Sequence, residues 1–144
     1  QWYHLGTNKM INEITMHRDR GNNLCCSDYT RDGANLVVAG ENRNLYVYDE
    51  KTTQLKCIMN DRHYKIPGHQ NRVFSIKCHP EDPNILVSAG WDRSIKIYDI
   101  RDKGPVASIG GSAVSGDSLD IFDDMVVCGN YKNRDVMQVY SIHH

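Results

Sequence analysis

A short phrase that ends a β-strand with a tyrosine recurs along this chain. It reads LYVYDE at Leu45–Glu50, IKIYDI at Ile95–Ile100 and MQVYSI at Met137–Ile142. A truncated copy, YHLGTNK, stands at Tyr3–Lys9, and the recurring tyrosines Tyr3, Tyr48, Tyr98 and Tyr140 are separated by 45, 50 and 42 residues. Self-similarity at such a period indicates a repeat architecture, in which each unit buries its apolar faces only by stacking on its neighbours. The chain therefore holds about three units rather than one ordinary core.

Strand signals dominate the rest of the sequence. The segments are short, rich in Val, Ile and Tyr, and bounded by Gly, Asn, Asp or Pro, as expected for β-strands joined by tight turns. They are Asn35–Gly40, Leu45–Asp49, Arg72–Cys78, Ile85–Gly90, Ser94–Asp99 and Met125–Gly129. No stretch shows a sustained apolar period of 3.6 residues, so we expect an all-β fold with almost no helix.

The strands and turns repeat in the order of an antiparallel meander with four strands to a unit. Residues 1–16 hold the end of one unit, residues 21–59 and 68–109 hold two complete units, and residues 115–142 hold three strands of a further one. The polar segment Asn60–Pro67 is expected to be an exposed loop.

Composition excludes several classes of partner and site. The 17 basic and 18 acidic residues give a formal net charge of -1, and the basic residues are scattered singly, so nucleic acid is not expected as a partner. No apolar run approaches the ~20 residues of a bilayer span, so no membrane partner is expected either. Neither a cofactor nor a metal is expected, because the Cys25-Cys26 and Cys78-His79 pairs are adjacent and adjacent side chains on a strand point to opposite faces.

The five cysteines are an odd number, and four of them lie on predicted strands. A free cysteine behaves there as a small buried hydrophobe. We therefore expect reduced core cysteines and a cytoplasmic protein, with the nucleus as an alternative location.

The second complete unit carries a resemblance to a known family. It reads GHQNRVFSIKCHPEDPNILVSAGWDRSIKIYDI over Gly68–Ile100. Its Gly-His pair, its Pro/Asp turn, its Ser-x-Gly-x-Asp segment and its strand ending in an aromatic residue and Asp resemble a WD40 repeat. The other units match more weakly, and the resemblance covers nearly the whole chain. It implies a segment of a WD40-type β-propeller with about three four-stranded antiparallel blades, which would belong to a longer ring or complete one by self-association.

In that family a blade is held by hydrogen bonds among a His, a Ser or Thr, an Asp and a Trp. The resemblance assigns these positions to His69, Ser88, Asp92 and Tyr98, with tyrosine in place of tryptophan. A buried carboxylate has to be hydrogen-bonded, so we expect a structural role for this set. Its His, Ser and Asp also have the composition of a nucleophilic triad. Ser88, however, lies within an apolar strand rather than on an exposed elbow, so no catalytic residue is expected.

The neighbouring units depart from that pattern. The first complete unit has Val38, Asn42 and Tyr48 at the matching positions and no Gly-His pair before Leu24, and in the last unit Val127 replaces the serine. A short insertion at Tyr131–Arg134 lengthens the turn of the last unit. We expect these units to depend more on packing than on a polar network.

The resemblance also implies a partner-binding face, formed by the loops between second and third strands and by the start of each first strand. The corresponding positions are Arg72, Phe74 and Trp91 in the best-matching unit, Asn23, Cys25 and Glu41 in the unit before it, and Ser115, Asp117 and Asn130 in the last. The partner-binding residues that we predict are Trp91, Phe74, Arg72, Glu41 and Asp117.

Trp91 is the strongest of these candidates. A tryptophan contributes nothing to the formation of a polar hairpin turn, whereas an exposed Trp with an Arg nearby is typical of binding hot spots. The alternative is that Trp91 packs on the neighbouring blade and that Arg72 is an ordinary solvated charge.

The sequence therefore predicts a non-catalytic scaffold that binds partner peptides or domains. Two other functions stay open. One is a hydrolase with a site on the propeller face. The other is a reader of phosphopeptides or ubiquitin, which needs a basic cluster, such as Arg72, Arg93 and Arg101.

Overall fold

All regular elements in the described residues are β-strands, which confirms the expected all-β class. The computed structural model describes residues 2–13, 22–59, 66–132 and 136–142. Within these ranges the strands are β1 (Trp2–His4), β2 (Lys9–Asn12), β3 (Leu24–Tyr29), β4 (Asn35–Gly40), β5 (Leu45–Asp49), β6 (Leu55–Met59), β7 (Val73–Cys78), β8 (Ile85–Gly90), β9 (Ser94–Asp99), β10 (Gly104–Gly110), β11 (Leu119–Phe122), β12 (Met125–Gly129) and β13 (Met137–Ser141). The described part of the chain contains no helix that could cross a membrane.

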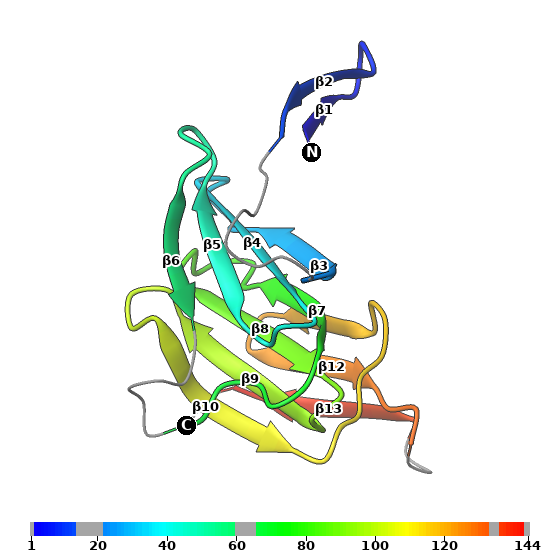
Figure 1. Cartoon of the computed structure of the whole chain (residues 1–144). Helices are drawn as coiled ribbons and strands as arrows, with labels where there is room; N and C mark the ends of the chain where they lie inside the picture. Colours follow the sequence, from blue (N-terminus) through cyan, green and yellow to red (C-terminus); the bar gives the residue numbers. More distant parts are fainter. Residues whose placement is uncertain (1, 14–21, 60–65, 133–135, 143–144) are drawn as a thin grey trace.

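Consecutive strands pair antiparallel, as a meander requires. The first sheet has the order β3-β4-β5-β6, the middle sheet β10-β9-β8-β7 and the third sheet β11-β12-β13, while β1 and β2 form a separate pair. The three larger sheets lie face to face with the middle sheet between the other two (Figure 1). This arrangement of antiparallel sheets matches the blades of a propeller.

The predicted strand positions are largely confirmed. β4, β5, β8, β9 and β12 have the predicted bounds, because Gly, Asn and Asp turn residues flank each of them. β7 begins at Val73, one residue later than predicted. Residues 14–16 of the first predicted unit, residues 60–65 of the predicted exposed loop and residues 133 and 134 of the predicted insertion lie outside the described residues.

The described core has three apolar clusters: two larger ones, one on each face of the middle sheet, and a small one of Val38, Tyr46 and Tyr48 in the first sheet. The first cluster joins Val37, Ala39, Leu45, Val47 and Met59 of the first sheet to Val73, Ile76, Leu86, Tyr98 and Ile100. The second joins Val87, Ala89, Ile95 and Ile97 of the middle sheet to Val114, Leu119, Ile121, Val126 and Cys128. Neighbours such as Leu86 and Val87 face opposite clusters because side chains alternate along a strand. β8 therefore reads as a nearly continuous apolar run, while β9 contributes Tyr98 to the first cluster and Ile95 and Ile97 to the second.

The five cysteines are free thiols. Cys26, Cys57 and Cys78 pack against the first cluster and Cys128 belongs to the second, while Cys25 is exposed. Burial raises the pKa of both Cys26 and Cys78 to about 12. These two thiols stay protonated near neutral pH and act as small apolar side chains.

A candidate partner-binding surface

The first strand of both the first and the middle sheet, β3 and β7, contains a β-bulge near its start. The register shifts between Leu24 and Cys26 in β3 and between Val73 and Ser75 in β7. The extra residues are Cys25 and Phe74, and a bulge re-aims the residue that it inserts. Phe74 thereby leaves the regular inward and outward alternation of β7.

Glycine is required opposite each bulge. The carbonyl oxygens of Asn23 and Arg72 accept the N–H groups of Glu41 and Trp91, each at 3.1 Å. A Cβ on Gly40 would lie 2.0 Å from the Asn23 oxygen, and one on Gly90 would lie 2.1 Å from the Arg72 oxygen. Because both atoms belong to backbone, they cannot move aside cheaply. Gly90 thus fixes where Arg72 and Trp91 stand, and Gly40 does the same for Asn23 and Glu41.

Four of the predicted binding residues form one continuous row. The rings of Phe74 and Trp91 are 4.8 Å apart between centroids and inclined by 43°. The Arg72 guanidinium carbon lies 5.7 Å from the centroid of Trp91, and Arg72 Nη1 pairs with Glu41 Oε1 at 2.9 Å. Asn23 extends the row by donating its amide N–H to Glu41 Oε2 at 3.1 Å. We call Phe74, Trp91, Arg72 and Glu41 the binding row.

The binding row is accessible although its members touch one another. Trp91 is 39% exposed, and Phe74 is partly buried. Trp91 packs on Phe74 and Arg72, which come from the residues at the start of β7 in its own sheet. The Arg72–Glu41 pair links the middle sheet to the first.

The candidates from the third sheet are not members of the binding row. Asp117 accepts a hydrogen bond from Ser75 Oγ at 3.2 Å and pairs with Lys77 Nζ at 3.3 Å, while its side chain stays 76% exposed. Ser115 is exposed as well. Asn130 is 3% exposed, and its amide donates to Gln138 Oε1 at 3.3 Å. The assignment of Asn130 to a binding surface was wrong, because its side chain holds the end of β12 to β13.

The predicted structural set of the middle sheet forms a compact polar cluster. His69 Nδ1 lies 2.8 Å from Asp92 Oδ2, and His69 Nε2 lies 2.7 Å from Ser88 Oγ. The backbone N–H groups of Gln70 and Ser94 also donate to the Asp92 carboxylate, at 2.9 and 3.2 Å. The Tyr98 ring stands beside His69, with a centroid distance of 6.4 Å.

The charge state of Asp92 follows from these contacts. Burial by itself would raise the pKa of Asp92. The hydrogen bond and the charge interaction with His69, together with the hydrogen bond from the Gln70 N–H, outweigh the effect of burial and lower the pKa to about 2. The carboxylate is therefore ionised and ties the segment before β7 to the β8–β9 turn. That turn begins with Trp91.

The neighbouring sheets also have polar contacts, at other positions than the middle sheet. In the first sheet, the Asn42 side chain donates to the Tyr46 hydroxyl, and the Asn42 N–H donates to Asn22 Oδ1 at 3.0 Å. In the third sheet, Ser112 Oγ donates to Gln138 Oε1 at 2.5 Å and lies 2.9 Å from the Tyr140 hydroxyl. The expectation that these units depend mainly on packing missed Ser112 and Gln138. A glutamine inside the predicted strand phrase MQVYSI was the available signal.

The predicted basic cluster does not assemble. Arg72 and Arg93 lie at the end of the middle sheet where β8 turns into β9, but Arg101 follows the opposite end of β9. Arg101 Nη2 pairs with Asp99 Oδ2 at 2.5 Å. Arg101 is thus both distant from Arg72 along the sheet and neutralised.

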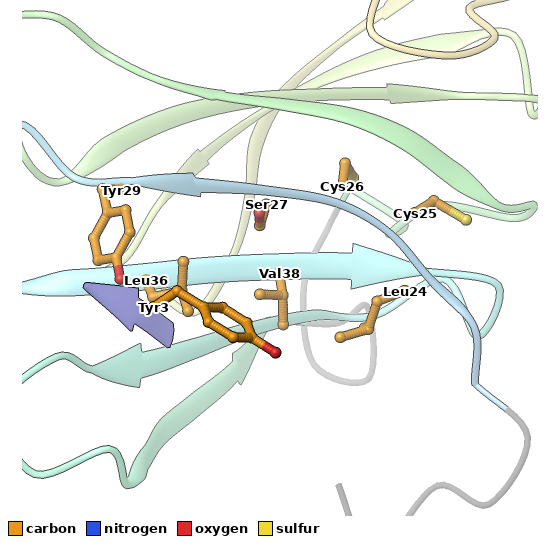
Figure 2. A pocket seen from close by; sticks show the side chains of 8 residues that line it. All are labelled: Tyr3, Leu24, Cys25, Cys26, Ser27, Tyr29, Leu36 and Val38. Atoms are coloured by element: carbon orange, nitrogen blue, oxygen red, sulfur yellow. The ribbon is translucent and has the colours of Figure 1, made fainter. Parts of the chain in front are cut away.

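A separate hollow of about 580 Å³ lies between β1 and the inner strands of the first sheet. It is lined by Tyr3, Leu24, Cys25, Cys26, Ser27, Tyr29, Leu36 and Val38. Figure 2 shows the Tyr3 side chain lying beside Leu36 and Val38. No carboxylate or imidazole of the described residues lines this hollow. Nor do any three His, Cys, Asp or Glu side chains of the described residues converge in a way that could hold a metal ion.

Comparison with known proteins identifies the repeat. The family model described as "WD domain, G-beta repeat" matches residues 60–99. The human U5 small nuclear ribonucleoprotein 40 kDa protein is 30% identical over 86 residues, which cover 60% of this chain and 22% of that protein. The transcriptional corepressor LEUNIG_HOMOLOG of Arabidopsis thaliana is 23% identical over 129 residues, which cover 88% of this chain and 15% of that protein.

A solved structure, described as "Structure of U3-55K", shares the fold, with a TM-score of 0.72 at 16% sequence identity. The alignment covers 99% of this chain and 45% of that one. The matched segments span about a fifth or less of the curated relatives named above. Residues 60–99 thus match a WD40 repeat, and the chain as a whole is similar to WD-repeat proteins and shares the fold of this solved structure.

Proposed function

We propose that this chain is a non-catalytic protein-interaction scaffold of WD40 type, which binds partner peptides or domains through Trp91, Phe74 and Arg72. Glu41 takes part through its pair with Arg72, and Asp117, which binds Ser75 and Lys77 of β7, flanks this surface. The observation that carries the proposal is the binding row, in which aromatic rings and a guanidinium stack in contact on an exposed turn. Exposed Trp and Arg side chains of this kind are the commonest hot spots of protein interfaces. Two relatives are named as a small nuclear ribonucleoprotein component and as a transcriptional corepressor, and these names agree with a protein that acts within multi-protein complexes.

The division of the chain into blade segments 1–16, 21–59, 68–109 and 115–142 is part of this proposal. The outer faces of the first and third sheets expose large apolar side chains, among them Leu24, Met137 and Val139. A further blade or a second copy of the chain would bury them. The name of the U5 small nuclear ribonucleoprotein relative supports a nuclear location over the cytoplasmic one that the sequence predicted.

The alternative of a hydrolase has little support in the geometry. Ser88 is completely buried, and its hydroxyl is bonded to His69 inside the sheet. A nucleophile has to reach its substrate and needs an oxyanion site beside it. The His69–Ser88–Asp92 cluster fits a structural role instead.

Replacement of Trp91 by Ala tests the proposal. We expect partner binding to weaken by about tenfold or more, because truncation of a central aromatic hot spot typically costs about 2 kcal/mol or more. The measurement is affinity capture with the whole protein, quantified by mass spectrometry and accompanied by a thermal melt. The matched control is Phe122→Ala, since Phe122 is 68% exposed at the end of β11, at the opposite end of the sheets. Identical capture profiles for the wild type and Trp91→Ala would refute the assignment.

A further inference from the structure

The end of the sheets that carries the binding row has a surplus of cations. The β4–β5 turn contributes Arg43, the β8–β9 turn Arg93, and the β12–β13 connection Lys132, all exposed. Arg72 precedes β7 at the same end, because its carbonyl accepts the Trp91 N–H. The described carboxylates here are Glu41, Asp92 and Asp117.

Each of these carboxylates already has a cationic or polar partner. Glu41 binds Arg72 and Asn23, Asp92 binds His69 and two backbone N–H groups, and Asp117 binds Lys77 and Ser75. No ion pair within the described ranges involves Arg43 or Arg93. The surface around the binding row therefore attracts anionic groups more strongly than cationic ones.

Arg72 is prepared to bind a carboxylate. A guanidinium has five N–H donors, and the Glu41 contact engages Nη1. Its group lies over the Trp91 ring, and the Arg72 side chain is 45% exposed. A planar, stacked guanidinium with donors to spare matches the fork of a carboxylate. The Glu41 carboxylate at its side would repel a doubly charged phosphate more strongly than a singly charged carboxylate, so this arrangement favours a carboxylate over a phosphate.

The aromatic part of the row supplies the second half of the site. Phe74 and Trp91 present a partly exposed apolar surface directly beside Arg72. A ligand that uses both halves carries a large apolar side chain next to an anionic one. Arg43 and Arg93 come from equivalent turns on neighbouring sheets, with φ values of 73° and 61°. They would attract further acidic residues on either side.

We propose that this surface selects acidic peptide segments in which an aromatic or large aliphatic residue neighbours an Asp or Glu. The apolar side chain packs on Phe74 and Trp91, and the carboxylate accepts hydrogen bonds from Arg72. This inference rests on the proposed function, because it specifies the ligand of the same surface.

Selection from a displayed library of random peptides on the whole protein tests the inference. Each enriched peptide is measured again on Trp91→Ala, and those that weaken by about tenfold or more identify ligands of the binding row. We expect these peptides to place Asp or Glu beside Trp, Phe, Leu or Ile. Arg72→Ala should weaken them by about tenfold, and Arg43→Ala and Arg93→Ala by about two- to fivefold each. Arg31→Ala, in the exposed β3–β4 turn at the opposite end, is the matched control and should change nothing.

The outcomes separate the two proposals. Trp91-dependent peptides that are neutral or basic would overturn the acidic preference and leave the scaffold intact. A gain of tenfold or more when the Asp or Glu is replaced by phosphoserine would also overturn it in favour of a phosphopeptide reader. If no enriched peptide depends on Trp91, the proposed binding surface itself fails. Arg72→Lys adds a check, because it keeps the charge but loses the fork and should bind less tightly than the wild type.

Discussion

The first and middle sheets share a backbone design but fill it with different side chains. Both have a bulge in the first strand and a glycine, Gly40 or Gly90, packed against the backbone carbonyl that precedes that strand. In both, the turn after the second strand holds an arginine in the left-handed conformation. The middle sheet adds the buried cluster of His69, Ser88 and Asp92, where the first sheet has Val38 and the Asn42–Tyr46 contact. The comparison indicates that steric fit sets the shape of the turn. The polar cluster then contributes a separate stabilisation to the sheet that carries Trp91.

Replacement of Gly90 by Ala should have the largest effect. The added Cβ would meet the Arg72 carbonyl at 2.1 Å, so the bulge has to shift. We expect a loss of about 3–5 kcal/mol in the free energy of unfolding, in the range of severe overpacking and backbone strain. Gly40→Ala should cost about as much, since its Cβ would lie 2.0 Å from the Asn23 oxygen. Urea unfolding measures both.

Gly129→Ala is the matched control for these variants. Its nearest neighbour is the Ser118 Cβ at 3.1 Å, a side-chain atom, so the cost should stay near or below about 1 kcal/mol. Equal losses at Gly90 and Gly129 would contradict the steric explanation.

Removal of the polar cluster should cost less than the glycine variants but more than the corresponding change in the first sheet. His69→Ala leaves the Ser88 hydroxyl and the Asp92 carboxylate without their shared partner inside the protein. The expected loss is about 2–3 kcal/mol. Asn42→Ala should cost about 1 kcal/mol, because the hydrogen bonds of its side chain to Tyr46 and Asn44 lie at a partly buried site and involve no buried charge. Chemical denaturation of the two variants side by side decides whether the middle sheet depends more on polar contacts.

Acid should weaken the middle sheet through Asp92. The folded pKa of about 2 lies below the ordinary value of 3.8 for an aspartate, so the carboxylate stabilises the fold above about pH 4. This contribution is lost as the pH falls from about 4 towards 2. It amounts to about 1–2 kcal/mol after allowance for solvent screening.

The difference in unfolding free energy between the wild type and Asp92→Asn isolates the contribution of Asp92. This comparison is necessary because Asp32, Asp49 and Asp99 also have lowered pKa values, through hydrogen bonds from neighbouring residues. The difference should shrink between pH 4 and pH 2. A constant difference over that window would contradict the assignment.

The sequence was sufficient for the strands and much less so for the site. Turn residues such as Gly40, Asn44 and Asp99 punctuate apolar runs, which is why several strand bounds could be predicted to the residue. The Glu41–Arg72 pair could not be predicted, since it joins two sheets across a distance that depends on how the bulges are placed. Asn130 was misplaced for a related reason. Its position in a turn indicates exposure, whereas the chain around Ser112 folds over it.

The double-sided packing of β8 and β9 has a consequence for cooperativity. In a stack of neighbours, stability is close to a sum of terms between adjacent modules. Fraying of the third sheet would disrupt its interface with the middle sheet and leave the interface between the first and middle sheets intact. Opening of the middle module would dissolve both at once, so its backbone amides should exchange with solvent only through global unfolding. The module that displays Trp91 is thus the least free to fluctuate, which gives its ligand a preorganised platform.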